Sequence, residues 1–109
     1  MQKNLTLKIS NYHWKAFFIP LPMTEFMFHI NRKWRFDFAW PDKMIALEQE
    51  GGIWTYGRHS IGKGFILDIE KYNSATMLGW RVFRCTPQQL ESGEILEFLS
   101  QIWKKKITS

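Results

Sequence analysis

Residues Trp34–Trp40 read WRFDFAW and place an aromatic residue at every second position. Strict alternation of this kind predicts a β-strand with one buried face. The next segment, Met44–Glu50, reads MIALEQE, and the intervening Pro41–Lys43 has the proline and aspartate that favour a turn. The two segments together therefore predict a β-hairpin.

The register of this hairpin follows from side-chain size. Large residues on adjacent antiparallel strands must share a face, so Phe38 is expected opposite Leu47. Trp40 then lies opposite Ile45, which requires a four-residue connection, Pro41–Met44. The same alternation puts four aromatic side chains on one face: Trp34, Phe36, Phe38 and Trp40.

Three carboxylates are expected on the opposite face of the hairpin. In this register Asp37 lies opposite Glu48, and the period of two adds Glu50. Carboxylates that face one another repel unless a cation or a basic side chain compensates. Mg²⁺ prefers oxygen ligands, and the backbone carbonyl of Gln49 supplies a fourth oxygen. The alternative is a solvated face with ion pairs to basic residues, namely Arg35 and Lys71.

The remaining elements are predicted from periodicity and from turn residues. They are a short helix within Leu5–Phe18, a strand from Glu25 with Phe26 and Phe28 on one side, a glycine-rich loop from Gly51 to Gly64, a helix over Phe65–Leu78 ended by Gly79, a strand over Trp80–Cys85, and a last helix from Pro87 to Lys104, capped by Thr86 and interrupted by Gly93. This order predicts an α/β fold with a mixed sheet flanked by helices.

Length and composition set the class of protein. A chain of 109 residues with 45% hydrophobic residues can bury one core, so residues 1–109 are expected to form one domain. The net charge of +5 favours a polyanionic partner. The single cysteine, Cys85, indicates a reducing compartment, and no apolar run is long enough for a membrane span or a signal peptide. A cytoplasmic location without a membrane partner is therefore predicted.

Several ordered motifs resemble the PD-(D/E)XK nuclease superfamily. They are Glu25, RFDFAWP at Arg35–Pro41, EQEGG at Glu48–Gly52, GRH at Gly57–His59, KYN at Lys71–Asn73 and GWRVFR at Gly79–Arg84. They look most like the small phage-type endonucleases related to very-short-patch-repair and Holliday-junction-resolvase-like enzymes. The resemblance spans about residues 20 to 90 and implies a restriction-endonuclease-like fold and Mg²⁺- or Mn²⁺-dependent hydrolysis of DNA.

The resemblance also implies roles for individual residues. Asp37, Glu48 and the Gln49 carbonyl would hold the metal ion, with Glu25 assisting a second ion. The superfamily motif usually ends in lysine, whereas this chain has Glu50 at that position. Glu50 would then act as general base, with Lys71 in the electrostatic role of the missing lysine.

Further residues are expected to act on the DNA backbone or on the attacking water. His59 is expected to position water beside the carboxylates, or else to cap backbone groups of its loop. The candidate phosphate contacts are Arg35, Arg58, Lys63, Arg81 and Arg84. A homodimer would bring two centres to the two strands of a duplex. The other readings of the sequence are a non-catalytic DNA-binding module on the same scaffold and an RNA-directed nuclease.

Overall fold

Four strands form one mixed sheet in the order β1-β2-β3-β4. The structure, a computed structural model, describes residues 11–50 and 63–104. The strands are β1 (Met23–Met27), β2 (Arg35–Trp40), β3 (Ile45–Gln49) and β4 (Arg81–Cys85). The pairs β1–β2 and β2–β3 are antiparallel, whereas β4 lies parallel to β3. A parallel neighbour needs a crossover connection, and the helix between β3 and β4 provides it.

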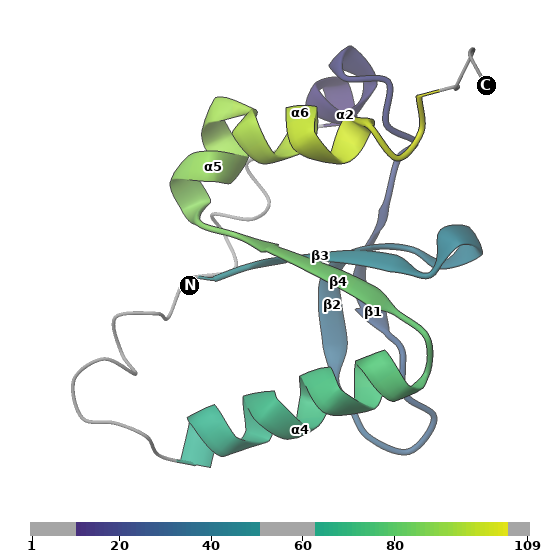
Figure 1. Ribbon diagram of the computed structural model, residues 1–109, viewed down its shortest axis with the longest axis vertical. Helices are drawn as coiled ribbons and strands as arrows, with labels where there is room; N and C mark the ends of the chain where they lie inside the picture. The colour runs from purple at the N-terminus through teal and green to yellow at the C-terminus, as the bar shows by residue number, and fades with distance from the viewer. Residues whose placement is uncertain (1–10, 51–62, 105–109) are drawn as a thin grey trace.

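Helices cover both faces of this sheet (Figure 1). The crossover helix α4 (Lys63–Met77) lies along one face. On the other face lie three shorter helices: α2 (Asn11–Ala16), α5 (Pro87–Ser92) and α6 (Glu94–Ser100). The predicted α/β class with a mixed sheet flanked by helices is therefore confirmed.

The register of the β2–β3 hairpin is the one that side-chain size predicts. Phe38 pairs with Leu47, and Trp40 pairs with Ile45. A short 3-10 helix, η1 (Pro41–Lys43), makes the turn, and Met44 closes it with a left-handed backbone at φ 55°. The connection is thus the four residues Pro41–Met44.

The helix boundaries follow the capping residues of the sequence. Gly79 follows α4 with a φ of 97°, a conformation that favours glycine. Thr86 and Gln89 form a capping box at the start of α5. Gly93, at φ 88°, divides the predicted last helix into α5 and α6. The helix expected within Leu5–Phe18 is present as α2, and residues 1–10 lie outside the described part.

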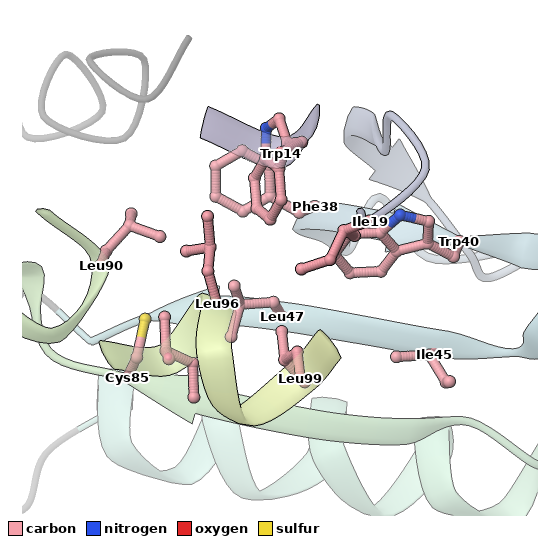
Figure 2. Packing of buried hydrophobic residues seen from close by; sticks show 11 residues of the cluster. Trp14, Ile19, Phe38, Trp40, Ile45, Leu47, Cys85, Leu90, Leu96 and Leu99 are labelled. Carbon is pink, nitrogen blue, oxygen red and sulfur yellow. The ribbon is translucent and has the colours of Figure 1, made fainter. Parts of the chain in front are cut away.

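Two hydrophobic clusters lie on the two faces of the sheet. The larger one packs the sheet against α2, α5 and α6 through residues that include Trp14, Phe38, Leu47 and Leu96 (Figure 2). The smaller one, between the sheet and α4, contains Phe36, Ala39, Ala46, Ala75 and Trp80. Because both clusters exclude water from the sheet, the central strands are buried on both faces.

The aromatic stripe of β2 does not stay on one face as predicted. Phe38 and Trp40 belong to the larger cluster, whereas Phe36 belongs to the smaller one and stacks on Phe28 at 4.1 Å. The β2–β3 pairing ends at Phe38, so the parity of the hairpin no longer constrains the residues before it. Trp34, also expected in the stripe, is only half-buried.

No helix within residues 11–50 and 63–104 combines the length and the apolar character needed to cross a membrane.

Candidate active site

A pair of buried carboxylates lies where β2 and β3 separate. Asp37 on β2 and Glu48 on β3 expose only 5% and 6% of their surface. The backbone N–H of Asp37 donates to Glu48 Oε2 at 2.7 Å, and the backbone N–H of Gln49 donates to Asp37 Oδ2 at 2.9 Å. Each carboxylate therefore reaches the main chain of the opposite strand.

These hydrogen bonds replace the strand pairing that ends one residue earlier. The paired residues of β2 and β3 stop at Phe38 and Leu47. Beyond that point the amides of Asp37 and Gln49 bond to carboxylates, which satisfies donors that would otherwise be costly to bury. The expected juxtaposition of Asp37 and Glu48 is thus present, and the local separation of the strands is what admits their side chains.

Helix α4 directs two side chains at Glu48. Lys71 Nζ lies 2.9 Å from Glu48 Oε1, with both side chains largely buried. The hydroxyl of Tyr72 donates to the same oxygen at 2.7 Å. Glu48 thus accepts one hydrogen bond from β2 and two from α4, which fixes its orientation beside Asp37.

Burial and charge act in opposite directions on Glu48. Burial raises the pKa of its carboxyl above the ordinary value, and the charge of Asp37 raises it further, while Lys71 lowers it. Burial and the charge of Glu48 also raise the pKa of Tyr72. Tyr72 therefore stays protonated as a hydrogen-bond donor. The two neighbouring carboxylates would also stabilise a cation placed near Asp37 and Glu48.

Glu50 is brought to the same side but is held by a different partner. Its Oε2 accepts a hydrogen bond of 2.7 Å from Arg84 Nε, and this bond raises the pKa of Arg84. The Arg84 guanidinium in turn lies 4.8 Å from the centre of the Tyr72 ring. Arg84 therefore connects Glu50 to the residues around Glu48. Arg84 is thus an ion-pair partner of Glu50, and its expected contact with phosphate stays a prediction.

The predicted group of three carboxylates is not assembled as a metal centre. Within residues 11–50 and 63–104, no three or more His, Cys, Asp or Glu side chains are grouped so that they could hold a metal ion. Asp37 and Glu48 alone form the acidic pair. A hard cation is commonly held by one or two carboxylates, with water and phosphate as the other ligands, so this pair fits the protein part of a Mg²⁺ shell.

Glu25 on β1 and Arg35 on β2 contact each other. Arg35 Nη1 is 3.5 Å from Glu25 Oε1, and both side chains are partly exposed. Glu25 adopts a left-handed backbone with φ 49°, between the β1 residues that pair with Phe36 and Phe38. The structure therefore does not place Glu25 with Asp37 and Glu48 as a shared metal group.

The remaining predicted residues fall in other places. Arg81 is exposed on β4. Lys63 begins α4, and its side chain lies outside the description. Arg58 and His59 lie outside the described residues.

Burial raises the pKa of the Cys85 thiol to about 12, so this thiol is not an available nucleophile at neutral pH.

Tyr72 is the functional candidate whose contact the sequence reasoning did not assign. Tyr72 lies in the KYN motif, in which only Lys71 was expected to act in the site. The available signal was that Tyr72 follows Lys71 on the helix, where consecutive side chains point about 100° apart. Both side chains in fact converge on one oxygen of Glu48.

Comparison of the chain with protein-family models, with curated proteins and with solved structures finds no significant match.

Proposed function

We propose that this protein is a Mg²⁺-dependent endonuclease that hydrolyses phosphodiester bonds in DNA. The observation that carries the proposal is the buried pair Asp37 and Glu48, with Lys71 at 2.9 Å from Glu48. Buried carboxylates are costly unless positive charge and hydrogen-bond donors compensate them, and acidic groups perturbed in this way are common at functional sites. The net charge of +5 supports a polyanionic substrate.

The order of elements supports a restriction-endonuclease-like assignment of the fold. An antiparallel hairpin presents Asp37 and Glu48, and a crossover helix then packs Lys71 against them before a parallel strand follows. This agrees with the arrangement that the resemblance to PD-(D/E)XK nucleases implies. The family assignment is part of the proposal and rests on these residues.

Asp37 and Glu48 are the residues that would hold the metal ion. When bound there, Mg²⁺ would lower the pKa of its water and offset negative charge on the phosphate. Lys71 supplies further positive charge to the reacting phosphate, and Tyr72 keeps the Glu48 carboxylate in place. Glu50 accepts the proton of the attacking water, in an orientation that Arg84 fixes.

Cleavage of supercoiled plasmid and of a four-way junction tests this proposal. The wild-type protein is compared with Asp37→Asn and Glu48→Gln, with Mg²⁺, with Mn²⁺ and with chelator. Asp42→Asn, which removes an exposed carboxylate in η1, is the matched control. We expect metal-dependent nicking in the wild type and the control, and at least 100-fold less in the two site variants.

Other outcomes of the same assay point to other functions. Tight DNA binding without cleavage, unchanged by either substitution, would favour a non-catalytic binding module. Cleavage of RNA but not of DNA would favour an RNA-directed nuclease. Glu50→Lys tests the general base, because full activity in this variant would show that Glu50 does not accept the proton.

A further inference from the structure

A cleft of about 380 Å³ lies between α4 and the connection from β1 to β2. Lys33, Trp34 and Arg35 line it from the β1–β2 side. Asp68 and Lys71 line it from α4. The cleft is shallow and open to solvent, which suits one charged group of an extended ligand rather than an enclosed small molecule.

The cleft and the proposed active site share the side chain of Lys71. This residue lines the cleft, and its Nζ also contacts Glu48 at 2.9 Å. Whatever occupies the cleft therefore lies next to the side chain that neutralises Glu48. In a nucleic-acid strand, the neighbour of the phosphate being cut is another phosphate.

Basic side chains around this cleft outnumber acidic ones only when Lys71 is counted, and Lys71 is paired with Glu48. Its lining holds Lys33, Arg35 and Lys71 against two carboxylates, Glu25 and Asp68. The contact between Arg35 and Glu25 is 3.5 Å long and half-exposed, and such ion pairs contribute little to stability. Arg35 can therefore turn to an incoming phosphate at small cost.

The connection that carries Lys33 is held in shape by its neighbours. His29 Nδ1 accepts two backbone hydrogen bonds of 3.0 Å, from Asn31 and Arg32. The Arg32 guanidinium lies 3.9 Å from the centre of the Trp34 ring and 3.5 Å from Glu70 of α4. Because the contacts of His29 and Trp34 hold this connection in one conformation, less conformational entropy is lost when a ligand binds beside it.

We propose that this cleft binds the backbone phosphate next to the one that is cut, with Lys33 and Arg35 as its contacts. The inference rests on the proposed function, because it names part of the substrate path of the same site. It adds Lys33 as a phosphate ligand and assigns Arg35 to one position along the strand.

The binding part of the proposal is tested with a fluorescent DNA duplex in buffer with chelator, so that no strand is cut. Affinity is measured by anisotropy at several salt concentrations for wild type, Lys33→Ala and Arg35→Gln. Lys15→Ala is the matched control, because Lys15 is an exposed lysine of α2 on the other side of the sheet. A lost phosphate contact lowers the slope of log K against log salt by about 0.9, and the control should leave it unchanged.

The position along the strand is tested by cleavage in Mg²⁺. Single phosphates of the substrate are replaced by neutral methylphosphonates on either side of the cut. We expect the rate deficit of Lys33→Ala to disappear with one replacement, adjacent to the cut, and to persist with all others. Equal deficits with every replacement would overturn the assignment.

The outcomes separate this inference from the proposed function. If Lys33→Ala and Lys15→Ala bind alike while the wild type cuts DNA, the cleft proposal fails alone. If the wild type binds with the Lys33-dependent slope but never cuts, the nuclease proposal fails while the phosphate contact remains. If the wild type binds no nucleic acid, both proposals are overturned.

Discussion

The carboxylates of Asp37 and Glu48 each bond to the main chain of the opposite strand, at 2.9 and 2.7 Å. Each side chain therefore serves the fold at the point where β2 and β3 separate, in addition to any part in chemistry. An alanine substitution at either position removes both contributions. Amide substitutions separate them, because they keep an acceptor oxygen while removing the charge.

Asp37→Ala should lower the free energy of unfolding more than Asp37→Asn. The alanine variant leaves the N–H of Gln49 without its carboxylate acceptor, which costs about 1–3 kcal/mol for a buried donor. The asparagine variant keeps an acceptor and removes a charge that raises the pKa of Glu48, so it should stay within about 1 kcal/mol of wild type. Urea denaturation with chelator measures both. Equal losses would show that the hydrogen bond to Gln49 does not stabilise the fold.

Tyr72→Phe should lower the free energy of unfolding by about 1–2 kcal/mol. The substitution removes only the hydroxyl that donates to the buried Glu48 carboxylate at 2.7 Å, and hydrogen bonds to charged groups are the stronger kind. Tyr12→Phe is the control, because Tyr12 is 74% exposed and should show almost no change. Thermal and urea unfolding of the two variants provide the comparison. A loss of the same size at both positions would contradict the assigned role of Tyr72.

The hairpin could be predicted because the residues that determine its register and its turn are close together in the sequence. The large side chains of Phe38 and Leu47 must share a face, and Pro41 marks the turn, so register and connection length follow from residues close in sequence. The same alternation was wrong for Phe36, since the β2–β3 ladder ends before that residue. Where a strand is no longer paired with its neighbour, the alternation of the hairpin no longer determines which face each side chain lies on.

The partners within the site depend on contacts that are distant in sequence. Glu50 pairs with Arg84 because β4 lies parallel to β3, an arrangement set by the crossover helix. No local pattern fixes that register. Lys71 was predicted beside the acidic face from the resemblance, and its contact with Glu48 is present. The contact of Tyr72 with Glu48 depends on how α4 is rotated about its axis. Sequence periodicity determines that rotation only to within a residue.

The stability of the wild type should fall relative to Glu48→Gln as the pH rises above about 4.5 without divalent cations. Burial raises the pKa of Glu48 above 4.5 in the folded state. Between the two pKa values the folded protein holds more protons than the unfolded chain, so the free energy of unfolding decreases as pH increases. Glu48→Gln has no carboxyl that titrates at this position, so its stability does not follow this pH dependence.

Urea denaturation of both proteins across this pH range measures the difference. Glu97→Gln, an exposed glutamate of α6, controls for loss of one surface charge. If the wild type instead becomes more stable relative to Glu48→Gln as the pH rises, Lys71 outweighs burial and lowers the pKa of Glu48.

Ala75→Leu should reduce both stability and metal-dependent cleavage. Ala75 is fully buried in the cluster between α4 and the sheet, and it lies one turn after Lys71 on the same side of the helix. A larger side chain there costs about 1–3 kcal/mol through overpacking and pushes the helix outward. The Lys71 and Tyr72 contacts with Glu48, at 2.9 and 2.7 Å, would then lengthen. Thr76→Leu introduces the same side chain at an exposed position of α4 and should change neither property. Unfolding curves and plasmid cleavage under conditions where both variants are fully folded separate the two effects. Full cleavage by folded Ala75→Leu would mean that the position of α4 against the acidic pair does not limit activity.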